Sequence, residues 1–104
     1  MIKVKLTKKD DIIKNITVKG HALYDDFGKD IVCAAASSTI ITSINASLLI
    51  DKNSLTYENK NGLDIKVLKD DEVTTKIINN MVSNLQELEK AYPKNIQIKE
   101  ENNE

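Results

Sequence analysis

The chain has 104 residues, with 15 lysines and no arginine, 16 acidic residues, one cysteine and one histidine. A chain of this length forms one domain, and its 40% hydrophobic and 30% charged residues indicate a packed core beneath a charged surface, which excludes general disorder. The formal net charge of -1 gives no overall electrostatic reason to bind nucleic acid or an anionic membrane, so we expect neither partner.

A single cysteine excludes an internal disulfide, and one cysteine with one histidine supplies too few ligands for a typical structural zinc site. The N-terminus lacks the pattern of a signal peptide, and no uninterrupted apolar run reaches about 18 residues. We therefore expect a cytoplasmic protein that uses no metal or other cofactor. Thiol or imidazole chemistry would have to use Cys33 and His21.

The N-terminal quarter of the chain predicts a hairpin and a loop. Apolar and polar side chains alternate over residues 2–7, which is typical of a half-buried strand. Residues 8–11 are polar and predict a turn, and a second alternation within 12–19 predicts an antiparallel partner strand. Residues 22–29 follow neither a strand nor a helix pattern, so we expect a loop there.

The next segment predicts a long helix. From Asp30 to Asp51 the residues are apolar or small on nearly every side of a helical projection. Asp30 is a suitable N-cap because its side chain can accept hydrogen bonds from the first backbone N–H groups. A helix that is apolar around most of its circumference belongs in the centre of the fold or partly in a subunit interface.

Two further strands and a second helix follow. Residues 54–59 and 63–68 alternate on either side of Asn61-Gly62, which is a strong hairpin signal. The acidic residues 70–72 favour a helix N-terminus, and the helix is expected to end near Tyr92-Pro93. Its apolar stripe recurs at three- and four-residue spacing and comprises Val73, Ile77, Ile78, Met81, Leu85 and Leu88.

The last segment predicts a strand over residues 95–99 and a frayed acidic tail over 100–104. The expected order is therefore ββαββαβ. We predict a single α+β domain with a mainly antiparallel sheet, a central helix and a second amphipathic helix.

The single histidine and the single cysteine lie close to each other in this arrangement. His21 ends the second predicted strand and Cys33 lies in the first turn of the long helix, so the short loop between them allows the two side chains to meet. Backbone N–H groups at a helix N-terminus favour a thiolate and can stabilise an oxyanion, and a nearby imidazole can move protons. These are the requirements of a cysteine hydrolase. The alternative is a buried packing cysteine and an exposed turn histidine.

A longer motif surrounds these two residues. It contains Gly20-His21-Ala22, Phe27-Gly28, and the run Asp30-Ile31-Val32-Cys33-Ala34-Ala35-Ala36-Ser37. This motif resembles the signature of the ribosomal-processing cysteine proteases of bacteria, the Prp family. The resemblance extends over the whole chain in length and element order, and Asn45-Ala46 also fits it.

The resemblance implies that Cys33 is the nucleophile and that His21 is the general base and acid. Asp30 and Ser37 match supporting polar positions of the motif. Asp30 would either orient His21 or cap the helix, and Ser37 would either touch the site or serve packing and bond back to the helix. Gly20 and Gly28 match the glycines that bound a mobile loop in the family.

The resemblance also implies a substrate and an assembly. Family members remove a short N-terminal extension from the large-subunit ribosomal protein numbered twenty-seven, cutting after a Phe in an apolar segment that precedes basic residues, and they form homodimers. The residues between His21 and Phe27 are the variable part of the motif, so the resemblance assigns no role to them. As a separate hypothesis, we expect substrate contacts from the loop residues Tyr24, Asp25, Asp26 and Phe27. Asp25 and Asp26 would attract the basic flank, so replacing both with Asn should raise KM and weaken its salt dependence. The alternative is a solvated acidic loop.

Other interpretations stay open at this point. A non-catalytic ribosome-associated binding module of the same fold would not need His21 and Cys33, whereas a thiol redox protein would need a resolving cysteine that the chain lacks. Four lysines near the N-terminus either touch a ribosome or serve solvation and protection of a strand edge, namely Lys3, Lys5, Lys8 and Lys9.

Overall fold

The computed structural model describes residues 1–20 and 30–102. Within them it forms a five-stranded sheet of order β3-β4-β2-β1-β5 and two helices. The elements in chain order are β1 (Ile2–Lys9), β2 (Ile12–Lys19), α1 (Asp30–Ile50), β3 (Leu55–Lys60), β4 (Gly62–Val67), α2 (Glu72–Ala91) and β5 (Ile96–Asn102). The predicted α+β class and the ββαββαβ order are confirmed.

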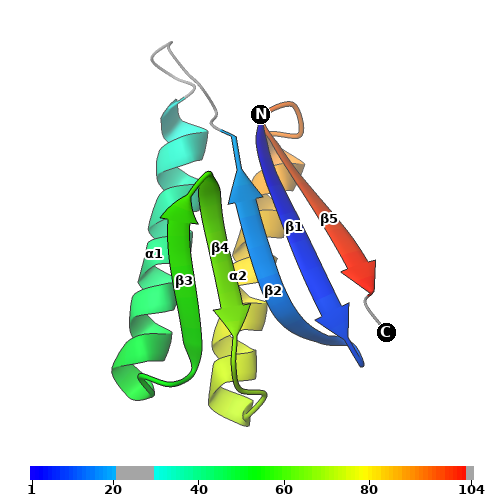
Figure 1. Ribbon diagram of the computed structural model, residues 1–104. Coiled ribbons are helices and arrows are strands. Elements are labelled where there is room, and N and C mark those ends of the chain that lie inside the picture. Colours follow the sequence, from blue (N-terminus) through cyan, green and yellow to red (C-terminus); the bar gives the residue numbers. More distant parts are fainter. Residues whose placement is uncertain (21–29, 103–104) are drawn as a thin grey trace.

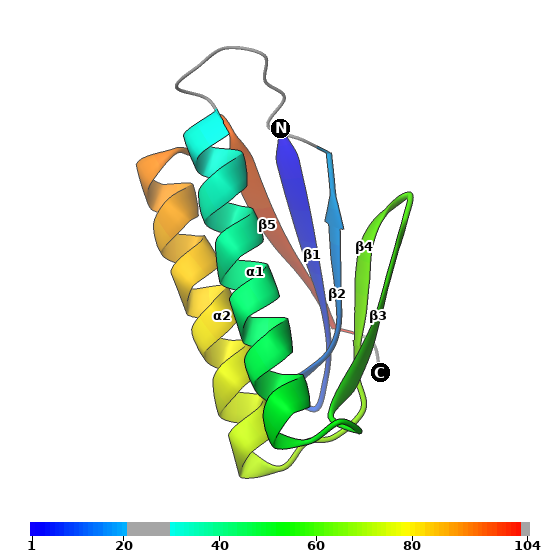
Figure 2. The same cartoon turned by 90° about the vertical axis from the view of Figure 1, so that its left-hand side faces the viewer.

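The fold has two layers (Figure 1). Both helices lie side by side on one face of the sheet, and neither helix covers the other face (Figure 2). The β1–β2, β2–β4 and β3–β4 pairs are antiparallel, whereas β5 runs parallel to its neighbour β1. The prediction of a mainly antiparallel sheet is therefore confirmed.

The core lies between the sheet and the helices. Alternate residues of β1 point inward, so Ile2, Val4 and Leu6 are buried while the lysines between them face the open side. The other buried apolar side chains are Ile13, Ile16, Val32, Ala36, Ile40, Ile44, Leu55, Ile65, Ile78, Met81, Val82, Leu85 and Ile96. Because successive side chains of a strand point to opposite faces of the sheet, every second residue packs against the helices.

The first turn is tighter than predicted. β1 continues to Lys9 because a register irregularity between Thr7 and Lys8 carries the pairing past the expected end. Only Asp10 and Asp11 remain for the turn, with φ angles of 54° and 63°. Two consecutive left-handed residues match a two-residue hairpin turn, and Asp tolerates that conformation better than most non-glycine residues.

The set of buried residues on α2 differs in part from the predicted apolar stripe. Ile78, Met81 and Leu85 are buried as expected, but Val73 is 45% exposed, and Thr74 and Val82 are buried instead. The helix is therefore rotated slightly from the orientation that Val73 implied. The predicted end near Tyr92-Pro93 is confirmed, since the helix ends at Ala91 with Tyr92 as C-cap.

The predicted acidic tail is wrong for residues 100–102, which belong to β5. Parallel pairing with β1 sets Leu6 beside Glu100 and Thr7 beside Glu101, so the strand gains backbone partners that local sequence could not reveal. Lys8 and Lys5 neutralise the two carboxylates, with N–O distances of 3.2 Å to Glu100 and 3.1 Å to Glu101.

α1 does not occupy the centre of the fold. It packs with one side on the sheet and on α2, and its outward side leaves large apolar residues exposed, namely Ile31, Leu49 and Ile50. Polar residues occur along the helix, yet Ile31–Ile50 reaches a mean hydropathy of 1.5, enough by length and composition to cross a membrane. A helix that packs on a sheet can have the same length and hydropathy, so these properties alone do not indicate a membrane segment.

Candidate active site

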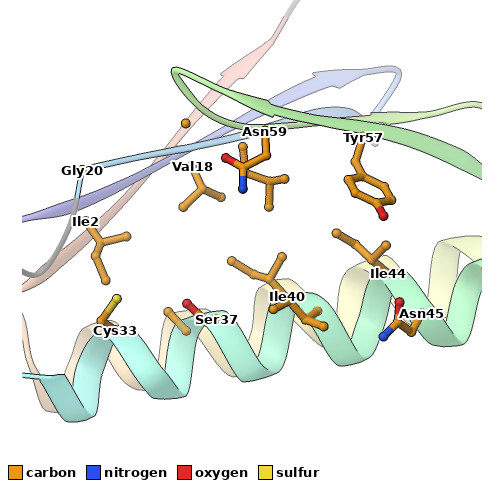
Figure 3. A pocket seen from close by; sticks show the side chains of 14 residues that line it. Ile2, Val18, Gly20, Cys33, Ser37, Ile40, Ile44, Asn45, Tyr57 and Asn59 are labelled. Carbon is orange, nitrogen blue, oxygen red and sulfur yellow. The ribbon is translucent and has the colours of Figure 1, made fainter.

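A cavity of about 460 Å³ opens between α1 and the sheet (Figure 3). The side that α1 contributes follows helical spacing and comprises Cys33, Ala36, Ser37, Ile40, Ile41, Ile44 and Asn45. From Cys33 to Asn45 the helix rises about 18 Å, which corresponds to about five residues of an extended peptide. The opposite wall comes from the inward faces of β1, β2, β3 and β4.

Cys33 lies at one end of this cavity. It is the fourth residue of α1, is half-buried and contacts the core, and its sulfur is directed from the helix towards the sheet near Ile2 (Figure 3). Position in the first helical turn places the thiol near the backbone N–H groups and the positive end of the helix dipole. The predicted position of Cys33 at the start of a long helix is confirmed.

Ser37 lies one helical turn after Cys33 and lines the same cavity. Its side chain is exposed, and Figure 3 shows it beside Cys33 on the cavity side of α1. The structure therefore brings these two predicted site residues together. Within the described residues Ser37 makes no hydrogen bond back to the helix, whereas Ser43 does make such a bond to the Thr39 carbonyl oxygen, at 2.8 Å.

The far part of the cavity contains polar groups to which the sequence motif assigns no role. Tyr57 and Asn59 extend from β3 towards α1, and Asn45 lies across from Tyr57 (Figure 3). Alternation along β3 indicated that Tyr57 and Asn59 share a face. Only the tertiary structure shows that this face lies opposite α1.

Gly20 borders the cavity directly after β2. Its φ angle is +83°, and a Cβ atom built on it would lie 2.3 Å from the carbonyl oxygen of Met1. Both features require glycine, because an L side chain would be strained and would overlap the backbone. Backbone conformation and the close approach of Met1 therefore explain why this position of the motif is a glycine.

Several predicted site residues lie outside the described residues. They are His21, Tyr24, Asp25, Asp26, Phe27 and Gly28, together with the rest of the loop predicted over 22–29. Asp30 is the first residue of α1 rather than the residue before it, so its predicted position as the N-cap is displaced by one residue.

The carboxyl groups with clearly shifted pKa values in the described residues lie away from this cavity. The pKa of Asp51 is lowered, mainly by a hydrogen bond from Lys69, and the pKa of Asp71 is lowered, mainly by a hydrogen bond from the Thr74 side chain. Asp51 follows the C-terminus of α1 and Asp71 caps α2. These groups stabilise helix ends and connections, and neither of them lines the cavity.

Comparison with known proteins places the chain in a family. The model of the family described as "Cysteine protease Prp" matches residues 1–97. The ribosomal processing cysteine protease Prp of Staphylococcus aureus is 31% identical over 103 residues, which cover 94% of this chain and 97% of that protein.

Solved structures give the same result. The S. aureus ribosomal processing protease Prp with a covalently linked product peptide has a TM-score of 0.87 at 27% identity, covering 97% of this chain and all of that one. The S. aureus enzyme with a substrate peptide has the same TM-score at 25% identity and the same coverage. A Streptococcus mutans protein, at 21% identity and a TM-score of 0.87, shares the fold over 99% of this chain and 96% of its own.

The family match and the structural matches extend over nearly the whole chain, including the segment that carries Cys33 and the strands that face it. The chain therefore belongs to the cysteine protease Prp family and is a cysteine protease.

Proposed function

We propose that this cysteine protease removes a short N-terminal extension from the large-subunit ribosomal protein numbered twenty-seven, cutting after a Phe. The names of the S. aureus relatives support ribosomal processing, and one relative was solved with a substrate peptide. The cavity beside Cys33 supports an apolar peptide, because its middle is lined by Val18, Ile40, Ile44 and Leu63. An apolar segment before the scissile bond would bury its side chains there.

In the proposed reaction Cys33 is the nucleophile. Its thiolate attacks the scissile carbonyl carbon, and the oxyanion that forms is stabilised by backbone N–H groups at the start of α1. His21, which takes the thiol proton as general base, then gives it to the leaving amine as general acid. Water, deprotonated by His21, attacks the resulting thioester, and the C–S bond breaks to release the extension and restore the thiol.

The observation that carries this proposal is the position of Cys33. It lies in the first turn of α1 at one end of a largely apolar cavity, in a chain that belongs to a cysteine protease family. Ser37 is proposed as a supporting residue beside the thiol, and Asp30 as a residue that either orients His21 or favours the helix start. Asp25 and Asp26 are proposed to attract the basic flank of the substrate.

The test uses a peptide with an apolar segment that ends in Leu and Phe and is followed by basic residues. The parent chain should cleave it after the Phe, whereas Cys33→Ala and His21→Ala should lose activity by about 10³-fold or more. Ser38→Ala is the matched control, since Ser38 is exposed on α1 but does not line the cavity, and it should keep full activity.

Other outcomes of this test would contradict the proposal. Cleavage of a peptide in which Ala replaces the Phe, at the parent rate, would contradict the proposed specificity. Equal binding without cleavage by the parent and both variants would favour a ribosome-associated binding module instead.

We also propose a homodimer in the cytoplasm. The outward side of α1 exposes Leu49 at 88% and Ile50 at 62%, and a second copy would remove these side chains from water. A reducing compartment would keep the single thiol at Cys33 available for catalysis.

A further inference from the structure

The face of the sheet opposite the helices concentrates positive charge near the start of β1. The pairing register sets Lys3 directly beside Lys19 of β2 and Lys5 directly beside Lys99 of β5. These four residues, Lys3, Lys5, Lys19 and Lys99, form what we call the lysine patch. Neither helix covers this face, as Figure 2 shows.

The lysine patch surrounds a shallow hollow of about 240 Å³. Besides the four lysines, the hollow is lined by Val4, Thr17 and Gln97, and none of its lining residues is acidic. Lys5 has one carboxylate partner, Glu101, at 3.1 Å. In the described part of the chain, the other three lysines of the patch form no ion pair.

Strand pairing and edge protection do not account for this arrangement. Like charges directly opposite each other on neighbouring strands are destabilising. Lysines often protect an exposed strand edge, but β1 is an inner strand between β2 and β5, so edge protection does not apply to Lys3 and Lys5. The net charge of -1 describes the whole chain and hides this local excess, which only the register brings together.

We propose that the lysine patch binds the phosphate backbone of RNA without reading its sequence. Lysine ammonium groups bind phosphate as point charges, and Thr17 and Gln97 supply neutral hydrogen-bond donors between them. Among the described residues, no aromatic side chain on which a base could stack lines the hollow, so contacts to the backbone would dominate.

A membrane surface fits the lysine patch less well. The only aliphatic residue at the hollow is Val4, which is 2% exposed and points into the core, so no apolar side chain is available for insertion into lipid. An RNA backbone also offers an unbroken series of charges to four neighbouring ammonium groups. The patch lies on the other face of the sheet from the cavity at Cys33, so RNA and a peptide can be bound together.

The experiment titrates a fluorescein-labelled single-stranded RNA of mixed sequence with the full chain and follows fluorescence anisotropy. Four phosphate contacts predict a slope of about -2.8 for log K against log salt, which makes binding about 50-fold weaker at 200 mM than at 50 mM salt. Lys3→Gln/Lys99→Gln should reduce the slope to about -1.4.

The matched control is Lys76→Gln/Lys90→Gln, which removes the same charge from exposed positions on α2. It should leave the slope unchanged. Lys3→Gln/Lys99→Gln should melt no lower than the parent, because it relieves like-charge contacts, and should cleave a short peptide at the parent rate, because the patch is separate from the cavity.

Three results would overturn the proposal. The first is no RNA binding at about 50 mM salt. The second is a reduction of the salt slope in the α2 control that equals the reduction in Lys3→Gln/Lys99→Gln. The third is equal competition by poly-glutamate or by phosphatidylserine vesicles at the same charge concentration, which would assign the patch to an acidic protein or a membrane. The proposal does not rest on the proposed peptide substrate, so it can fail while cleavage is confirmed.

Discussion

At the scale of single residues, three positions around the cavity differ in what they require of the side chain. Cys33 lies in the first turn of α1, and its neighbour Ser37 lines the same cavity one turn away. Gly20, at the edge of the same cavity, is required by backbone geometry. Substitutions of Ser37 and Gly20 should therefore have separable effects on cleavage and on stability.

Ser37→Ala should lower kcat/KM by about tenfold, the value of one neutral hydrogen bond to the reacting groups, without changing the melting temperature. Stability should hold because the Ser37 side chain is exposed. Peptide cleavage and thermal unfolding, measured on the same samples, check both parts. If Ser37 serves only packing, Ser37→Ala will cleave as fast as the parent chain.

Gly20→Ala should destabilise the fold by about 1–3 kcal/mol, because the new Cβ would be strained and would meet the Met1 carbonyl oxygen. Denaturant unfolding measures this loss. An unchanged free energy of unfolding with a lower kcat would instead show that Gly20 acts only as a loop hinge.

At the scale of elements, the ends of the two helices are held by polar contacts. Asp71 accepts a hydrogen bond from the Thr74 backbone N–H at the start of α2, and the Ser47 and Ser54 hydroxyls bond at 2.6 Å where α1 leads into β3. Asp51, just after α1, pairs with Lys69 before α2. These contacts set where each helix begins or leaves the sheet.

Asp71→Ala should lower the melting temperature near neutral pH, because α2 loses its N-cap. Hydrogen bonds from Thr74 hold the pKa of Asp71 below its usual 3.8, so its ionised form is stabilising above that value and the contribution disappears as pH falls through the lower, folded-state pKa. The difference in melting temperature between parent and variant should therefore shrink below about pH 3.8. A constant difference across that range would contradict a role for the charged form.

At the scale of the complete fold, the two faces of the sheet differ in the side chains they present. One face joins the helices and forms both the core and the cavity at Cys33, while the open face carries the lysine patch. The outer side of α1 remains apolar and exposed. The proposed peptide, RNA and second copy of the chain would therefore occupy three separate surfaces.

The proposed dimer should be disrupted by Leu49→Lys/Ile50→Lys, two exposed positions on α1 that do not line the cavity. Each substitution should weaken self-association by about 10- to 100-fold, the value of burying one aliphatic side chain. Analytical ultracentrifugation measures this, with Val73→Lys on α2 as the control. A parent chain that sediments as a monomer would contradict the dimer.

Local sequence was enough to predict the elements, the α+β class and the position of Cys33 at a helix start, because hydrophobic periodicity, the Asn61-Gly62 turn and the acidic residues that precede α2 act locally. The motif around Cys33 also pointed to the family, since the residues that carry it lie within one short stretch of the chain.

What those elements face was decided by tertiary contacts, since strand partners and helix orientation depend on distant segments. Parallel pairing with β1 made residues 100–102 a strand instead of a tail. Packing on one face of the sheet left α1 half exposed and brought Tyr57 and Asn59 opposite Cys33's helix. The register alone gathered Lys3, Lys19 and Lys99, because residues of three separate strands become neighbours only when the sheet forms.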